Sequence, residues 1–141
     1  MDTETNAGMF SIAIDGKPPF NFDYVKAWQT TQYIEVYGAL EAWEQPVEKL
    51  TLRLADAIPA GSYNLNSPQV KLVDVSTGLV NTRYLAKSLT LNLTVANHAT
   101  KGMEATYAID ADEIYPGGSG KGIKLTGKFS VHYVNTATSR R

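Results

Sequence analysis

Three aromatic side chains give this sequence its clearest capacity for binding. Tyr33, Tyr37 and Trp43 occupy odd positions in residues 32–43, a stretch in which polar and apolar residues largely alternate. Side chains of a strand point alternately to opposite faces, so these three share the face turned away from the apolar residues. Rings on a flat sheet face offer a large contact area to a sugar ring or a partner protein. We predict a ligand-binding face here; the alternative is that a second sheet, a loop or a subunit covers it.

Three carboxylates lie close together at the end of another candidate strand, residues 103–111. Asp110, Asp112 and Glu113 form this cluster, and clustered carboxylate oxygens are the ligands that Ca²⁺ prefers. The spacing does not match a calcium-binding helix–loop–helix motif, and Asp110 and Asp112 fall on the polar side of a predicted strand. The sequence therefore favours a solvated strand face, and we predict no metal and no cofactor.

A glycine-rich segment, residues 117–122, superficially resembles a phosphate-binding loop. In such a loop, backbone N–H groups hold phosphate at the start of a helix. Here Tyr115 stands where the first glycine should be, no serine or threonine follows Lys121, and a strand is predicted next. The segment predicts a hairpin loop rather than a nucleotide site.

The chain has 2 histidines, and they leave a hydrolase as one alternative. His98 lies in a predicted loop, and His132 lies on the outward face of the last predicted strand beside Ser130. A histidine can activate a serine as a nucleophile, but it needs a carboxylate and a hydroxyl within hydrogen-bond reach. The sequence supplies no motif that brings such groups together, so we predict no catalytic residues.

Regular alternation defines the elements that must position these groups. Ser88 to Val95 alternates throughout, which places Leu89, Leu91, Leu93 and Val95 on one face. Similar patterns recur along most of the chain, with turn signals between them. They predict an all-β domain, an antiparallel β-sandwich or a flattened β-barrel of roughly 8–10 strands.

Two segments near the N-terminus punctuate this pattern. Asp15-Gly16 follows the first predicted strand and favours a type I′ hairpin turn, which requires positive φ at both residues. Pro18-Pro19 cannot donate hydrogen bonds, so the returning arm must lie at a sheet edge. Residues 23–31 are ambiguous, and a short helical turn is expected there.

The longest predicted strand, residues 32–43, is expected to pair with residues 47–54. A turn around Gln45 sets the register, which gives the pairs Leu40–Leu50, Val36–Leu54, Glu41–Lys49 and Tyr37–Arg53. This register satisfies both the apolar face and the charges. A one-residue slip would expose the leucines.

Length and composition limit the remaining possibilities. At 141 residues, the chain is expected to form one domain, residues 9–135, between a disordered N-terminal tail, residues 1–8, and a C-terminal tail, residues 136–141. The 13 basic and 14 acidic residues leave a net charge of −1, with no basic excess for binding nucleic acid. Cysteine is absent, which excludes disulfides and thiolate metal sites.

The N-terminal residues also bear on location. They are polar and acidic, unlike a signal peptide, and no stretch is apolar enough to span a membrane. A cytoplasmic location and export without a visible signal both fit. The oligomeric state is open, with a homodimer formed through the edge of the first hairpin as one option.

The order of three segments resembles that of small bacterial surface and lipoprotein domains of unknown function. The segments are Phe-Ser-x-x-Ile-Asp-Gly-Lys at residues 10–17, Gly-x-Tyr-x-Leu at residues 61–65 and Gly-x-Phe at residues 127–129. The chain differs from those domains in having no lipidated N-terminal cysteine and in carrying Pro18-Pro19 after the lysine. The resemblance implies a non-catalytic antiparallel β domain and supplies no site residues.

Together these features predict a non-enzymatic binding module of bacterial origin. We expect it to recognise a carbohydrate or a protein partner through the exposed sheet face that carries Tyr33, Tyr37 and Trp43. The alternatives are a small-molecule carrier with an apolar barrel cavity and a hydrolase.

Overall fold

Alternating residues form strands throughout the computed structural model, which describes residues 7–41, 47–76, 83–114 and 122–135. These ranges contain eleven strands and no helix, which confirms the all-β prediction. They therefore hold no helix that is long and apolar enough to cross a membrane. The strands are β1 (Gly8–Ile14), β2 (Phe20–Asn21), β3 (Tyr24–Gln29), β4 (Tyr33–Ala39), β5 (Lys49–Ala55), β6 (Gly61–Tyr63), β7 (Val70–Ser76), β8 (Arg83–Asn97), β9 (Gly102–Ile114), β10 (Gly122–His132) and β11 (Val134–Asn135).

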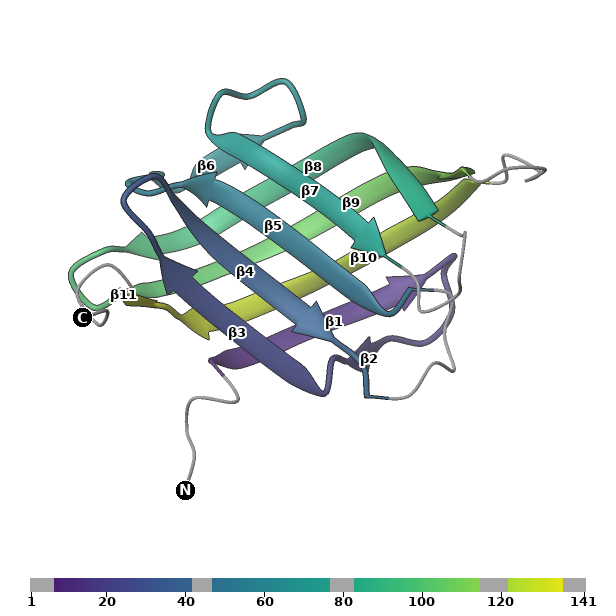
Figure 1. The fold of residues 1–141 in the computed structure, drawn as a ribbon, viewed down its shortest axis with the longest axis horizontal. Coiled ribbons are helices and arrows are strands. Elements are labelled where there is room, and N and C mark those ends of the chain that lie inside the picture. Colours follow the sequence, from purple (N-terminus) through teal and green to yellow (C-terminus); the bar gives the residue numbers. More distant parts are fainter. Residues whose placement is uncertain (1–6, 42–46, 77–82, 115–121, 136–141) are drawn as a thin grey trace.

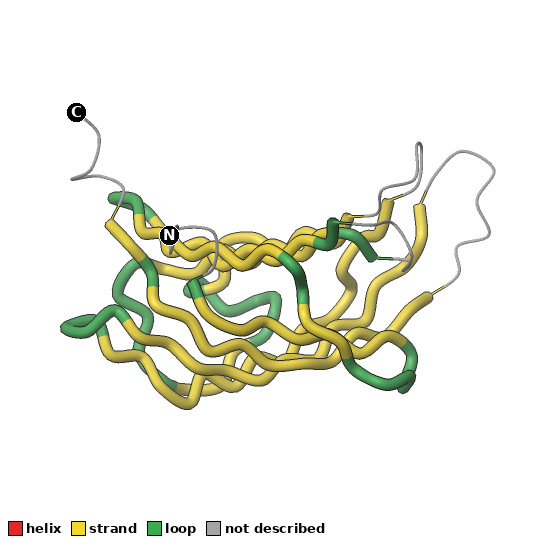
Figure 2. Tube along the Cα trace, turned by 90° about the horizontal axis from the view of Figure 1, so that it is seen from below, coloured by secondary structure: helices red, strands yellow, loops and turns green. Residues whose placement is uncertain are grey.

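All eleven strands belong to one sheet that folds over on itself. The order is β11-β3-β4-β5-β7-β8-β9-β10-β1-β2, with β6 paired to β8, and every pair is antiparallel except β11 with β3. Strands β3, β4, β5 and β7 form one layer, which crosses a second layer built from β8, β9, β10 and β1 (Figure 1). Figure 2 shows the two layers edge-on. The sheet does not close on itself, so the barrel form of the prediction is wrong and the two-layer form holds.

The open ends of the sheet are covered by short pieces of chain. Ala7 donates its N–H to the Val25 carbonyl at 2.7 Å and accepts a hydrogen bond from the His132 N–H at 2.9 Å. Strand β11 covers the rest of the β3 edge. At the other end β2 is only two residues long and follows Pro18 and Pro19. Such blunted edges oppose further strand pairing.

The core lies between the two layers and takes side chains from both. Its fully buried members come from alternate positions, as the sequence predicts; the largest are Phe10, Phe129, Ile12, Ile34, Leu50, Leu52, Leu54, Ile58, Leu91, Leu93, Met103 and Ile109. Val95 departs from the prediction, because it is 38% exposed. A bulge between Leu93 and Val95 shifts the alternation by one residue and turns Val95 outward, beside Glu104 on β9.

The first hairpin forms as predicted. Asp15 has a φ of 54° and Gly16 a φ of 76°, and the Lys17 N–H donates to the Ile14 carbonyl at 3.0 Å. Positive φ at both central residues defines a type I′ turn. The arm that follows Pro18 and Pro19 lies at the sheet edge, as expected.

The expected helical turn in residues 23–31 is wrong, because the chain forms β3 there. Val25 and Ala27 are buried and alternate with exposed Tyr24 and Lys26. Burial of two apolar side chains on one face of a strand thus outweighs a weak local preference for a helical turn.

Strands β4 and β5 pair as predicted, but their register is shifted by two residues. Val36 lies opposite Leu52, and Glu35 lies opposite Arg53, whereas the prediction placed Val36 opposite Leu54 and Tyr37 opposite Arg53. A shift of two keeps every side chain on its predicted face, so apolar alternation cannot distinguish the two registers. The Glu35–Arg53 ion pair, at 2.6 Å, is specific to the observed register.

A tyrosine and a glycine lock the second layer together. Tyr107 on β9 reaches across β10 and donates its hydroxyl to the Ser11 carbonyl of β1 at 2.8 Å. It passes over Gly127, where a Cβ would lie 2.7 Å from the Tyr107 hydroxyl and would overlap the Ser11 carbonyl oxygen. Burial raises the pKa of Tyr107 well above its usual range.

Substitution of Gly127 tests this packing. Gly127→Ala should lower the free energy of unfolding by about 1–3 kcal/mol, because backbone and phenol must both move. In the control Gly102→Ala, the nearest atom is His132 Nε2 at 3.3 Å on an exposed side chain. That change should alter stability by less than about 1 kcal/mol. Urea unfolding measures both variants, and equal effects would contradict the proposed clash.

The buried phenol also predicts a pH dependence. An unfolded tyrosine ionises near pH 10, while Tyr107 stays neutral in the folded state. Stability therefore falls as the pH rises above about 10, with at most about 1.4 kcal/mol per pH unit from this group. Tyr107→Phe should flatten the decline measured by urea unfolding between about pH 9 and pH 11. A decline as steep as that of the unaltered protein would show that Tyr107 ionises normally.

Candidate functional site

The strongest candidate site is the outer side of the β3–β4–β5–β7 layer, which faces the viewer in Figure 1. Tyr33 and Tyr37 lie there, both half-buried and two positions on either side of Glu35. They share a face as predicted. The third residue of the prediction, Trp43, lies outside the described residues.

Strand β3 adds two aromatic side chains that the sequence reading missed. Trp28 lies directly opposite Glu35, and Tyr24 lies opposite Ala39. Trp28 is half-buried, and Tyr24 is 39% exposed. The alternation from Tyr24 to Trp28 was the available signal, which the expected helical turn obscured. We call the surface formed by Tyr24, Trp28, Tyr33 and Tyr37 the aromatic face.

An ion pair occupies the middle of the aromatic face. Arg53 Nε donates to Glu35 Oε1 at 2.6 Å, and the guanidinium carbon lies 4.6 Å from the centre of the Tyr33 ring. Glu35 is only 7% exposed, because Trp28 and Arg53 flank it across the sheet and Tyr33 and Tyr37 flank it along β4. The hydrogen bond to Glu35 raises the pKa of Arg53 further above its usual value.

This arrangement leaves part of the arginine free for a ligand. The bond to Glu35 uses Nε, and no described residue accepts a hydrogen bond from the two Nη groups. The stacking on Tyr33 and the bond to Glu35 fix the plane of the guanidinium. The aromatic face can therefore combine ring stacking with two oriented hydrogen-bond donors.

Two carboxylates of the acidic cluster form ion pairs with lysines. Asp110 accepts hydrogen bonds from Lys124 Nζ and from the Ser88 hydroxyl, both at 3.0 Å, and Asp112 pairs with Lys87 at 3.3 Å. The bond from Lys124 holds the pKa of Asp110 below its usual value, with help from Ser88. Among the described residues, no three metal-ligating side chains converge. The cluster, with Glu113, is a half-exposed strand face.

The two histidines lie in different settings. His98 Nδ1 lies 2.7 Å from the Tyr133 hydroxyl, and Nε2 lies 2.7 Å from the Ile58 carbonyl oxygen. A carbonyl only accepts, so Nε2 donates and Nδ1 accepts from Tyr133. His98 thus ties the β8–β9 turn to two other segments. The exposed ring of His132 bonds to no described residue. The hydrolase alternative requires a carboxylate bonded to a histidine. Within the described ranges, neither histidine has one.

Of the glycine-rich segment, residues 117–121 lie outside the described residues, and Gly122 begins β10.

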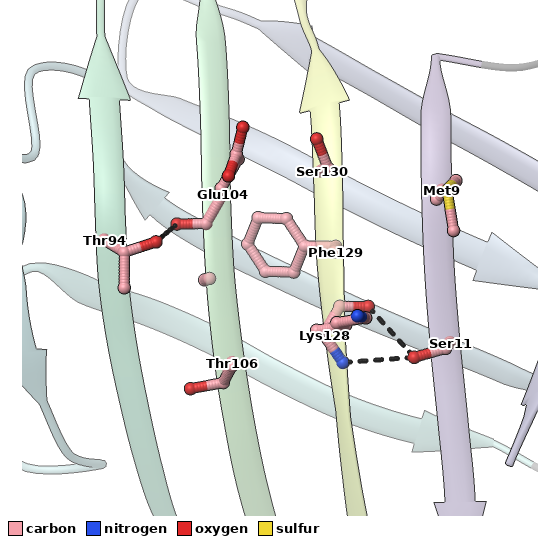
Figure 3. A pocket seen from close by; sticks show the side chains of 9 residues that line it. Met9, Ser11, Thr94, Glu104, Thr106, Lys128, Phe129 and Ser130 are labelled. Atoms are coloured by element: carbon pink, nitrogen blue, oxygen red, sulfur yellow. Dashed lines mark hydrogen bonds between the residues drawn. The ribbon is translucent and has the colours of Figure 1, made fainter.

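A shallow hollow of about 230 Å³ opens on the outer side of the second layer (Figure 3). It is lined by Met9, Ser11, Thr94, Glu104, Ala105, Thr106, Lys128, Phe129 and Ser130. It offers hydroxyls and one charge of each sign, and it opens on the surface rather than into the interior that a carrier would use.

Comparison of the chain with protein-family models, with curated proteins and with solved structures finds no match. The resemblance to small bacterial surface and lipoprotein domains therefore stays a prediction from the sequence.

The ion pair can be tested by a double-mutant cycle. Arg53→Met leaves the Glu35 carboxylate buried without its partner, so stability should fall by about 2–3 kcal/mol. The double variant Glu35→Gln/Arg53→Met should be more stable than Arg53→Met alone, because an amide is cheaper to bury than a charge. The exposed pair Lys124–Asp110 is the matched control and should show much weaker coupling. Equal coupling in the two cycles would contradict the role of Glu35 burial.

Proposed function

We propose that this protein is a non-enzymatic binding module that recognises carbohydrate through the aromatic face. The observation that carries the proposal is the placement of Tyr24, Trp28, Tyr33 and Tyr37 around one oriented ion pair on an outer sheet surface. A sugar ring has an apolar face and a rim of hydroxyl groups. Aromatic rings match the first, and the two free Nη groups of the Arg53 guanidinium match the second.

The central ion pair favours carbohydrate over a protein partner. The centres of protein–protein interfaces are depleted of charged residues, and their binding energy comes from anchors in desolvated pockets. Here Glu35 and Arg53 lie where such an anchor would insert. A glycan, by contrast, brings hydroxyl groups to every part of the surface it covers.

The same ion pair favours binding over catalysis. Glycoside hydrolases need a carboxyl group that can exchange a proton with the substrate, together with a second carboxylate. The Glu35 carboxylate is 7% exposed and bonded to Arg53 at 2.6 Å. This geometry supports a positioning role for Glu35 in fixing the arginine.

Affinity electrophoresis through gels containing soluble polysaccharides tests the proposal. At least one polysaccharide should retard the protein, and Tyr33→Ala, Tyr37→Ala or Trp28→Ala should weaken that binding about 10-fold or more. Thr126→Ala is the matched control, because Thr126 is exposed on the opposite layer. It should bind like the unaltered protein. Retardation that survives all three aromatic substitutions would contradict a site on the aromatic face.

A further inference from the structure

We propose that the glycan recognised by the aromatic face is acidic, a chain whose sugar carboxylates bind the guanidinium of Arg53. This inference rests on the proposed function and names the class of ligand for the same site. It is drawn from the charges that surround the rings and from the orientation of Arg53.

Cations outnumber carboxylates on the aromatic face. Lys26 on β3 lies beside Tyr37, and Lys49 on β5 lies beside Ala39, in the same outward rows as the rings. Both lysines are exposed, and neither forms an ion pair with a described residue. The whole chain carries a net charge of −1, so two unpaired ammonium groups beside a guanidinium are a local excess.

Two carboxylates lie among these cations. Glu35 is bonded to Arg53, and the Asp74 carboxylate, in the same row as Lys26, accepts a hydrogen bond from the Ser76 hydroxyl at 3.3 Å. The bond from Ser76 leaves the negative charge of Asp74 in place, so Arg53, Lys26 and Lys49 outnumber the two carboxylates by one. An anionic ligand would therefore meet a small excess of positive charge. Charge complementarity of this kind sets the choice of partner and speeds association.

Arg53 is oriented for a carboxylate in particular. With Nε bonded to Glu35, the edge formed by the two Nη groups remains. Two parallel N–H groups match the two oxygens of a carboxylate, which makes the contact bidentate. Because Tyr33 stacks on the guanidinium at 4.6 Å, a sugar carboxylate bound there would bring its ring close to the aromatic residues.

The surface suits a chain better than a single sugar. Trp28, Glu35, Arg53 and Leu72 form one row across β3, β4, β5 and β7. Strands lie about 4.8 Å apart, so this row spans about 14 Å. Lys26 belongs to the next outward row and Lys49 to the row after it, where they can meet further carboxylates of an extended polymer.

Substitution of Glu35 should tighten the binding of an acidic glycan, whereas most substitutions in a binding site weaken it. Its carboxylate orients Arg53 and also opposes the approach of an anion. Glu35→Gln keeps an oxygen that can accept from Arg53 Nε but removes the negative charge. Binding of an acidic glycan should therefore tighten, by about 3-fold or more, in this variant. Loss of a merely structural residue would weaken binding instead.

The probes are polygalacturonate, alginate and methyl-esterified polygalacturonate, which keeps the same backbone but masks the carboxylates. At least one of the two acidic polymers should bind, and binding should weaken as the salt concentration rises from about 50 mM to about 300 mM. For polygalacturonate, esterification should weaken binding about 10-fold. Arg53→Lys should weaken acidic-polymer binding about 5-fold although it keeps the charge, because an ammonium group cannot make the bidentate contact of a guanidinium. Lys26→Gln and Lys49→Gln should each weaken it less. Thermal unfolding confirms that each variant is folded.

The outcomes separate this inference from the proposed function. If neutral or esterified polymers bind as tightly as the acidic ones, and the aromatic substitutions abolish binding, the carboxylate inference is wrong and the carbohydrate function stands. Acidic-polymer binding that is unchanged in Arg53→Lys and Glu35→Gln also overturns the inference. If the folded protein binds no acidic, esterified or neutral polymer, both are overturned, and a protein partner becomes the better explanation of the aromatic face.

Discussion

The aromatic face depends on the register between β4 and β5. In the observed register Glu35 lies opposite Arg53, and the ion pair forms at 2.6 Å. The register expected from a turn at Gln45 would place Glu35 opposite Ala55 instead. A carboxylate that is 7% exposed would then lose its partner, at a cost of several kcal/mol. The ion pair thus favours one of two registers that turn the same side chains inward, and it fixes Arg53 over Tyr33.

The outer surfaces of the two layers differ in composition for a physical reason. Each strand gives its alternate apolar side chains to the core, so the remaining positions face outward and are free to vary. On the first layer these positions hold aromatic rings, three cations and two carboxylates, Glu35 and Asp74. On the second layer they hold mainly small polar residues, acids and lysines, several of which pair with one another. The unpaired cations beside rings distinguish the first layer as a place where a ligand adds interactions that the folded chain lacks.

Period-two patterns predicted much of the fold. They identified the inward faces of β4, β5, β8 and β10, and Asp15-Gly16 identified the first turn. They could not predict register beyond parity, because a shift of two residues preserves every face. The bulge that turns Val95 outward has no signature in alternation either. Tyr107 of β9 packs over Gly127 of β10 and bonds to Ser11 of β1. Alternation could not predict this contact, because β1 and β9 are distant in the sequence.

The candidate site was predictable only in part, because its residues come from three strands. Tyr33 and Tyr37 follow from the pattern of a single strand. Trp28 was missed because residues 23–31 were ambiguous and a short helical turn was one interpretation of them. The partnership of Arg53 with Glu35 required the correct register. The neutralised acids at Asp110 and Asp112 show the opposite case, in which the simple expectation of a solvated strand face was sufficient.

The most direct measurement of the central claim is a map of the binding surface by NMR. An oligomer of the acidic polymer that binds, galacturonate or alginate, would be titrated into ¹⁵N-labelled protein while the backbone amide signals and the Trp28 indole signal are followed. If the aromatic face is the binding site, the largest shifts fall on β3, β4 and β5, around Trp28, Glu35 and Arg53. Shifts centred on the second layer, around the hollow lined by Ser11 and Lys128, would contradict it.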